Sequence, residues 1–190
     1  TVSRNVLVTA GSRRVALVRA FQNALASIGG GRVVVTDVNP LSPSVYTADR
    51  SYLAPLSTDP AYLDVIADIC RTEDIGLVVP TIDDELTVFA NAVERFGADG
   101  VRVAVSPFET VSICNDKHAT SRVLRERGVA AVETFTPEEL SAHPTFPLFI
   151  KPRGGRGGVG AFAVQSSREL KFFLDYVPDP VVQTFLDGPE

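Results

Sequence analysis

The feature of this sequence that most restricts its fold is an alternation of short apolar runs with segments of helical periodicity. Residues 6–8 and 32–37 are valine-rich runs, and the first ends at Thr9-Ala10-Gly11-Ser12. Between them, apolar side chains recur at three- and four-residue spacing until a run of three glycines. Short, continuous apolar runs predict buried parallel strands, and the segment between them predicts a helix that the glycines end.

The same alternation continues to about residue 114. Further helical segments and apolar runs follow one another in the order helix 62–71, strand 76–80, helix 85–96, strand 101–105 and a helix that opens at Ser106-Pro107. Strands that alternate with helices predict a parallel sheet covered by helices on both faces. We therefore predict a Rossmann-like α/β domain over residues 1–114.

The pattern changes after residue 114. We expect a helix over 115–127, strands at 132–135, 147–152, 161–164 and 181–185, and a helix that begins near 166. Two of these strands are joined by a short glycine-rich loop, which predicts a hairpin. Residues 115–190 therefore predict a second, mixed α+β domain, which we expect to be incomplete.

Composition excludes several classes of partner. Apolar residues make up 45% of the chain and the net charge is −5, with no basic run. An acidic chain of this kind has no electrostatic reason to bind nucleic acid or an anionic membrane. No signal peptide or apolar run of membrane-spanning length is visible, and both cysteines are expected to be buried thiols. Cytoplasm is the expected location, and a homodimer is left open.

The strongest chemical signal is the segment that follows Lys151. Five of the seven residues from 154 to 160 are glycine, and Arg153 and Arg156 supply positive charge. Glycine lets the backbone approach a ligand and turn its N–H groups toward it, so the segment predicts a polyphosphate site. A flexible hairpin turn is the alternative, but such a turn needs only one or two glycines.

Two other phosphate-binding motifs do not fit. The P-loop pattern is absent, and a dinucleotide fingerprint needs a helix directly after its glycines. The turn after residue 8 holds a single glycine, Gly11. Asp37 could bind a ribose in an NAD-binding Rossmann protein, although capping or packing is the more ordinary role for such a residue. The NAD-binding alternative therefore has weak support.

Three segments in order resemble the motifs of the ATP-grasp superfamily, in its carbamoyl-phosphate-synthase-like branch. They are residues 115–117, residues 149–152 with the glycine loop, and residues 182–190. The first domain resembles the pre-ATP-grasp domain of that branch, including residues 81–86. The acidic cluster there could bind a metal, but capping of the following helix is the simpler interpretation.

The resemblance assigns roles to residues around the loop. It implies that Lys117 reaches the nucleotide and that Lys151 contacts both ATP phosphate and adenine. Lys117, at a helix start, is expected to have more rotamer freedom than Lys151, whose stem should be packed. The flap over the phosphates corresponds to the loop from Gly154 to Gly160, in which the expected binding residues are Gly154, Gly155, Arg156, Gly157 and Gly158.

The same resemblance assigns the end of the chain to adenosine. Gln183 occupies a position usually held by glutamate, near the adenine amino group, and its amide carbonyl can still accept a hydrogen bond. Thr184 and Leu186 match backbone contacts to adenine. Glu190 matches the acid that binds the ribose hydroxyls.

The implied activity is that of an ATP-dependent ligase. ATP with Mg²⁺ would activate a small-molecule carboxylate as an acylphosphate, which an amine or similar nucleophile then captures. The resemblance places the metal ligands after residue 190, so no catalytic residue or metal ligand is assigned and these 190 residues alone are expected to be inactive. The alternative is a non-catalytic, regulatory nucleotide-binding module with a degenerate ATP-grasp half.

Overall fold

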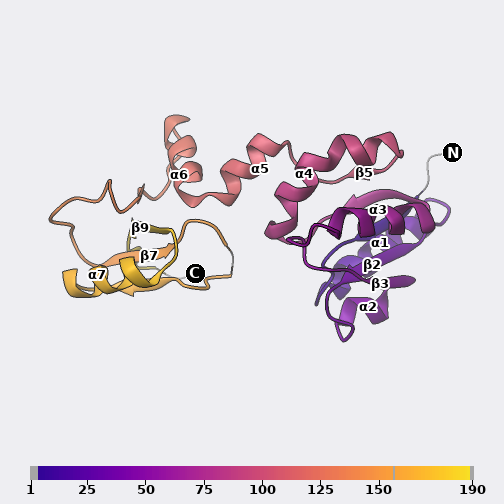
Figure 1. Ribbon diagram of the computed structural model, residues 1–190, viewed down its shortest axis with the longest axis horizontal. Coiled ribbons are helices and arrows are strands. Elements are labelled where there is room, and N and C mark those ends of the chain that lie inside the picture. Colours follow the sequence, from indigo (N-terminus) through magenta and orange to yellow (C-terminus); the bar gives the residue numbers. More distant parts are fainter. Residues whose placement is uncertain (1–3, 156, 189–190) are drawn as a thin grey trace. The chain divides into compact units, whose positions relative to one another are not determined.

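The computed structural model describes residues 4–155 and 157–188, and the chain forms two compact units, Thr1–Phe108 and Glu109–Glu190 (Figure 1). The sequence-based boundary after residue 114 falls within helix α5 (Phe108–Asn115). An α/β unit with a parallel sheet precedes a mixed α+β unit, which confirms the expected fold class.

Unit 1 is a parallel five-stranded sheet with strand order β3-β2-β1-β4-β5. Its elements alternate along the chain, as the sequence predicts: β1 (Asn5–Val8), α1 (Val15–Ser27), β2 (Val33–Asp37), α2 (Pro43–Thr47), β3 (Arg50–Leu53), α3 (Tyr62–Thr72), β4 (Ile75–Val79), α4 (Asp83–Ala98) and β5 (Arg102–Val103).

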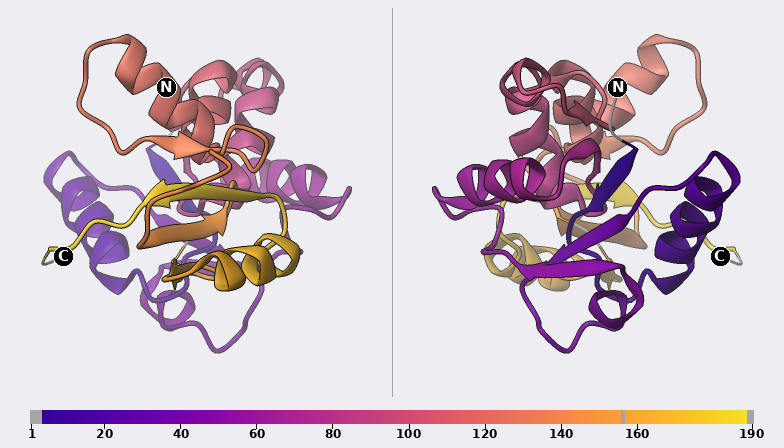
Figure 2. Two further views of the ribbon diagram at one scale, coloured as in Figure 1. Left: turned by 90° about the vertical axis from the view of Figure 1, so that its left-hand side faces the viewer. Right: turned by 90° about the vertical axis from the view of Figure 1, so that its right-hand side faces the viewer.

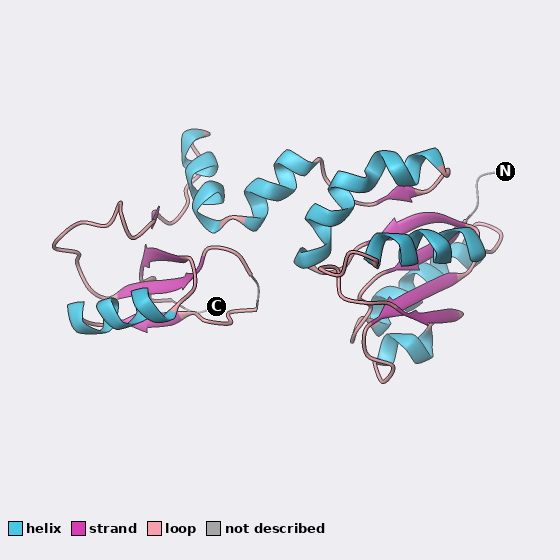
Figure 3. Cartoon of the chain, in the orientation of Figure 1, coloured by secondary structure: helices cyan, strands magenta, loops and turns pink. Residues whose placement is uncertain are grey.

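Helices bury both faces of this sheet, as Figure 3 shows by element type. Successive side chains of a strand point to opposite faces. Leu7 of β1 packs with Phe89 and Ile66 from α4 and α3, whereas its neighbours Val6 and Val8 pack with α1. Burial on both faces explains why these strands are continuous apolar runs without alternation.

The sequence did not predict α2 and β3. Strand β3 pairs only with β2 among the described strands, so it forms an edge of the sheet. Arg50, Ser51 and Leu53 are exposed there. An edge strand buries little of its surface, so residues 50–53 carry no apolar run for a sequence pattern to detect.

The single glycine after β1 has a packing role. A Cβ atom at Gly11 would lie 2.6 Å from Ser44 Oγ and 2.7 Å from a methyl group of Val35. Such contacts are far closer than side-chain atoms tolerate, so glycine is required by the neighbouring β2 and α2. The residue therefore gives no support to a dinucleotide site.

Unit 2 contains a four-stranded antiparallel sheet of order β6-β9-β7-β8. The paired strands β7 and β8 confirm the predicted hairpin around the glycine loop. The elements of this unit after α5 are α6 (Lys117–Glu126), β6 (Thr134–Phe135), β7 (Leu148–Pro152), β8 (Phe162–Val164), α7 (Ser167–Tyr176) and β9 (Pro180–Thr184).

The two faces of the second sheet differ in character. Leu148, Ile150 and Val182 pack with Leu170 of α7, which covers that face (Figure 2). Because side chains alternate along a strand, Phe149, Lys151 and Gln183 project from the opposite face. Lys151 and Gln183, two of the polar residues singled out from the sequence, therefore share one side of the sheet.

Two sequence-based expectations on exposure can be compared with the structure. Cys70 is buried as expected, whereas Cys114 is exposed, so the expectation that both thiols are buried is wrong. Cys114 lies on α5, whose buried large side chain is Val111. In the described part of the chain, no helix combines the length and the apolarity that a membrane crossing requires.

Candidate functional site

Four of the predicted site residues line one cavity of about 550 Å³ in unit 2. They are Lys151 of β7, Gln183 and Thr184 of β9, and Leu186, just after β9. The remaining lining residues are Val132, Phe149, Phe185 and Gly188. The register of β7 and β9 explains this grouping, because Phe149 lies directly opposite Gln183 in the antiparallel pair.

Two phenylalanine rings form part of the wall of this cavity. The Phe149 and Phe185 rings are tilted against each other with centroids 6.3 Å apart. The Lys151 ammonium lies 5.6 Å from the Phe149 ring centroid. Flat apolar surfaces with a few directed polar groups are typical of sites that hold a planar organic ligand.

Lys151 is the charged residue among those that line the cavity. Burial lowers the pKa of its ammonium, and the positive charge of Lys117 adds to that shift. No carboxylate of a described residue lies within ion-pair distance of the Lys151 amine. A half-buried cation beside a second cation is stabilised by an anion, so the geometry favours an anionic ligand here.

Gln183 has one of its two amide ends fixed by its neighbour. Its Nε2 donates to Thr134 Oγ1 at 2.6 Å, across the β6–β9 pair. The Thr134 hydroxyl in turn donates to the Val132 carbonyl at 3.2 Å, so its oxygen is an acceptor toward Gln183. This network leaves the Gln183 carbonyl oxygen as the group that can accept from a ligand.

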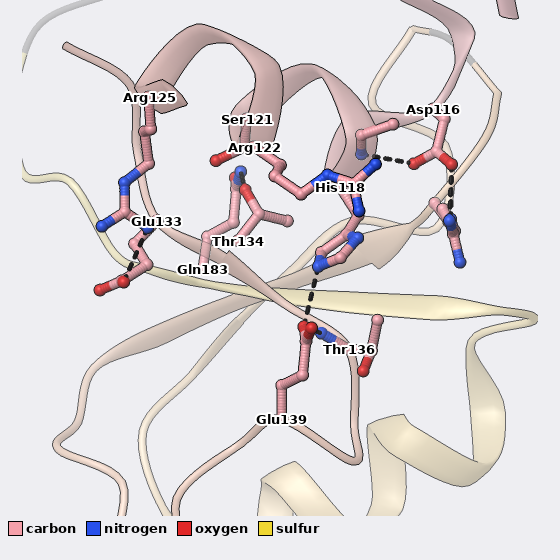
Figure 4. A network of polar contacts seen from close by, with 12 residues as sticks. Asp116, His118, Ser121, Arg122, Arg125, Glu133, Thr134, Thr136, Glu139 and Gln183 are labelled. Atoms are coloured by element: carbon pink, nitrogen blue, oxygen red, sulfur yellow. Dashed lines mark hydrogen bonds and ion pairs between the residues drawn. The ribbon is translucent and has the colours of Figure 1, made fainter. Parts of the chain in front are cut away.

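Polar contacts hold α6 to the segment around β6, as Figure 4 shows. Ser121 donates to the carbonyl of residue 132 at 2.6 Å. His118 Nε2 lies 2.8 Å from Glu139 Oε2, and Arg125 pairs with Glu133 at 2.7 Å. These contacts fix the helix whose N-terminal residues reach the glycine loop.

The glycine loop leaves β7 at Arg153 and returns at β8. Gly155, Gly157, Gly158 and Gly160 all have positive φ angles, from 67° to 85°. Residues other than glycine rarely adopt such angles, which explains the run of glycines. The described loop glycines are not lining residues of the cavity beside Lys151. The predicted contacts of Arg156 and Glu190 lie outside the described residues.

Residues at the start of α6 hold the base of the loop. The Lys117 ammonium donates to the carbonyls of Arg153, Gly154 and Gly155 at 3.3, 2.9 and 3.0 Å. Arg153 donates twice to Asp116 Oδ2, at 2.9 and 2.6 Å. The expectation that Lys117 has more freedom than Lys151 is wrong, because three backbone acceptors fix its ammonium.

One member of the acidic cluster in unit 1, Glu85, has a different role from the predicted one. Helix α4 starts at Asp83, and its N-cap, Ile82, makes no side-chain capping bond. Glu85 is only 3% exposed and accepts hydrogen bonds from Thr9 at 2.8 Å and Tyr62 at 2.5 Å. The prediction that Glu85 caps the helix is therefore wrong, since its carboxylate points into the core.

Burial raises the pKa of the Glu85 carboxyl, while hydrogen bonds from Tyr62 and Thr9 oppose that rise. The pKa of Tyr62 is raised by burial and by the neighbouring carboxylate. Across residues 4–155 and 157–188, no group of three or more His, Cys, Asp or Glu side chains could hold a metal ion.

Asp37 is occupied by its own backbone neighbourhood. Its carboxylate accepts from the N–H groups of Ser12 at 2.6 Å and Asn39 at 2.8 Å, and the residue is 6% exposed. It therefore packs and shapes turns, as the simpler interpretation expected.

Comparison with known proteins agrees with this architecture. The family described as PylC-like, N-terminal domain matches residues 6–104, and the ATP-grasp domain family matches residues 114–190. Carbamoyl phosphate synthase arginine-specific large chain of Bacillus subtilis (strain 168) is 24% identical over 173 residues, which cover 85% of this chain and 16% of that protein.

Solved structures share the fold across both units. L-amino acid ligase from Bacillus licheniformis has a TM-score of 0.76 at 20% identity, covering 100% of this chain and 46% of that one. The biotin carboxylase domain dimer of Hydrogenobacter thermophilus 2-oxoglutarate carboxylase, in complex with MgADP, ADP and bicarbonate, has a TM-score of 0.70 at 17% identity. That match covers 98% of this chain and 45% of that one.

The chain therefore belongs to the family with a PylC-like N-terminal domain, which is followed here by a match to the ATP-grasp domain family, and carbamoyl phosphate synthase large chains are among its relatives. It spans less than half the length of the ligase, the carboxylase domain and the synthase that it matches.

Proposed function

We propose that unit 2 binds ATP on the polar face of its sheet and that the protein acts as an ATP-dependent ligase. The observation that carries this proposal is Lys151, a half-buried cation without a carboxylate partner among the described residues, which borders an aromatic cavity. Polyphosphate supplies the missing charge, and the aromatic walls suit a purine. Matches to ATP-grasp families support the same ligand.

The base would lie against Phe149 and Phe185, with the Gln183 carbonyl oxygen accepting from the adenine amino group. Thr184 and Leu186 border the same cavity, and their backbone groups would complete recognition of the base. The phosphates would extend from Lys151 toward the glycine loop. Contacts from Arg156 and Glu190, outside the described residues, remain predictions.

The reaction that we propose is carboxylate activation. A carboxylate oxygen attacks the γ-phosphorus, the bond from that phosphorus to the bridging oxygen of ADP breaks, and an acylphosphate forms. An amine nitrogen then attacks the acyl carbon, loses a proton, and inorganic phosphate leaves. In this reaction, Lys151 and the glycine loop would bind ATP and stabilise the negative charge of its phosphates.

Magnesium accompanies ADP in the biotin carboxylase domain dimer from Hydrogenobacter thermophilus. The described residues offer no cluster of three candidate ligands. We assign no metal ligand in them and no step of the reaction to a metal.

Calorimetric titration with ATP, adenosine and NAD tests the nucleotide assignment. We expect ATP to bind more tightly than adenosine, because only ATP brings phosphate to Lys151, and NAD to bind more weakly than ATP. Tighter binding of NAD would contradict the assignment. In the full-length protein, ADP release that requires both a carboxylate and an amine would support a ligase, whereas ATP binding without any such turnover would support a regulatory module.

A further inference from the structure

The contact between Lys117 and the glycine loop has a geometric consequence for the loop's amide groups. An ammonium has three N–H donors, and here it meets three consecutive carbonyls, those of Arg153, Gly154 and Gly155. In a planar trans peptide, the C=O of one residue and the N–H of the next point in opposite directions. Gathering these carbonyls on Lys117 therefore turns the N–H groups of Gly154 and Gly155 away from it.

Those two N–H groups are available to a ligand. Neither donates a backbone hydrogen bond to another residue that the structure describes. Successive N–H groups that face the same side form a small concave site for an anion. The positive φ of Gly155, 85°, is the conformation that permits this arrangement.

A second contact anchors the strand end from which the loop departs. Arg153 donates from Nε and Nη2 to the same oxygen of Asp116. The other Asp116 oxygen caps α6 by accepting from the Ala119 N–H at 2.9 Å. The Lys117 N–H donates to the Arg153 carbonyl at 3.1 Å, so backbone and side chains act together.

Charge also favours this anchor. Burial acts to raise the pKa of the Asp116 carboxyl, but hydrogen bonds from Arg153 and from backbone N–H groups outweigh it, and the pKa lies below its ordinary value. The Asp116 carboxylate is therefore negatively charged near neutral pH, so its contact with Arg153 is an ion pair.

We propose that Asp116 and Lys117 form a clamp that holds the glycine loop, before nucleotide arrives, with the Gly154 and Gly155 N–H groups ready for phosphate. Both are positioning residues in this proposal, which rests on the proposed ATP site. It differs from the expectation that Lys117 itself contacts the nucleotide. The clamp lowers the ordering cost that a flexible glycine loop otherwise adds to binding.

Two variants separate the clamp from a direct phosphate contact. Lys117→Met removes the ammonium and keeps the apolar stem, while Asp116→Ser removes the charge but retains a residue that caps helices well. Arg122→Ala is the matched control, because it breaks an exposed arginine–carboxylate pair with Glu126 that lies within α6 itself. The measurements are ¹⁵N order parameters of Gly154 and Gly155 without nucleotide, and affinities for ATP and adenosine.

The clamp predicts that Lys117→Met lowers these order parameters from about 0.85 to below about 0.6 in nucleotide-free protein. We expect ATP affinity to fall by about fivefold in Lys117→Met and by about threefold in Asp116→Ser. Adenosine affinity should stay within about twofold of the parent, because the base site is not altered. The control should resemble the parent in every measurement.

Unchanged order parameters in Lys117→Met would overturn the clamp, and with weaker ATP binding they would identify a direct phosphate ligand. A loosened loop with parental ATP affinity would overturn the positioning role. A parent protein that binds no ATP overturns the proposed function instead. The order parameters are measured without nucleotide, so the two failures can be told apart.

Discussion

The two units treat their buried ionisable groups in opposite ways. In unit 1, the Glu85 carboxylate is almost fully buried and accepts hydrogen bonds from the hydroxyl groups of Thr9 and Tyr62. In unit 2, the half-buried Lys151 ammonium contacts the Phe149 ring but no carboxylate of a described residue. The hydrogen-bond partners of Glu85 all belong to the protein, whereas we propose that the partner of Lys151 is a ligand.

This difference separates stability from binding. A buried polar group whose partners are all in the protein stabilises the fold, and removal of one partner leaves the others unsatisfied. A cation held at an energetic cost beside another cation contributes little to the fold, and we propose that its partner is the ligand. Variants in the two units should therefore have separable effects.

The largest expected effect comes from opening the closed network. Glu85→Ala removes the acceptor of two buried hydroxyl groups and leaves a cavity, so unit 1 should lose about 3 kcal/mol in the free energy of unfolding. Urea unfolding of the variant measures this loss. Glu94→Ala, an exposed site on the same helix, is the control and should stay within about 0.5 kcal/mol of the parent. If Glu85→Ala lost no more stability than this control, the hydrogen bonds of Glu85 with Thr9 and Tyr62 would not be stabilising.

The second effect concerns binding alone. Lys151→Met keeps the apolar stem on Phe149 and removes the charge, so ATP affinity should fall roughly tenfold to a hundredfold. Thermal unfolding without nucleotide should not shift downward, because no described carboxylate loses its partner. Lys171→Met, an exposed lysine of α7, is the matched control. Normal ATP binding by Lys151→Met would mean that the phosphate site is elsewhere, and a large drop in stability would make Lys151 a structural residue.

A smaller effect follows from pH. Because burial raises the folded-state pKa of Glu85, the folded state holds more protons than the unfolded state between the ordinary and raised values. Stability therefore decreases as pH rises through that window, and the decrease is complete above the folded-state pKa. Glu85→Gln cannot titrate, so its stability relative to the parent should improve from acid to neutral pH. Parallel pH profiles for both proteins would contradict this contribution.

The sequence predicts well those parts whose cause is local. Strands buried on both faces are apolar runs, and glycines recur where φ is positive, so the parallel sheet and the hairpin loop were visible. Strand β3 was not, because an exposed edge needs no apolar pattern. The contacts of Lys117 with carbonyls of residues 153–155 join segments distant in sequence, and only the fold reveals them. Likewise, Glu85 belongs to an acidic triplet that is typical of a helix start, and nothing local distinguishes the one buried member.

Gln183 combines the two kinds of network, since one end of its amide is satisfied by the protein and the other is available to the ligand. Its Nε2 donates to Thr134 Oγ1, whose own proton goes to the Val132 carbonyl. In the proposed site, the amide oxygen would accept from adenine, which presents an amino group. Guanine presents a carbonyl oxygen at that position, and two facing acceptors repel each other.

Thr134→Val removes the acceptor that orients the amide, so Gln183 can turn and offer its NH₂ group to guanine. The ratio of ATP to GTP affinity should then fall by about two- to fivefold, an effect on the order of 1 kcal/mol or less. Thr72→Val, at an exposed site in unit 1, controls for the loss of a hydroxyl group. Calorimetric titration of both variants with each nucleotide measures the ratio. Valine has almost the same shape as threonine, so the substitution tests the hydroxyl group alone. A ratio equal to that of the parent would therefore show that the Thr134 hydroxyl does not set base preference.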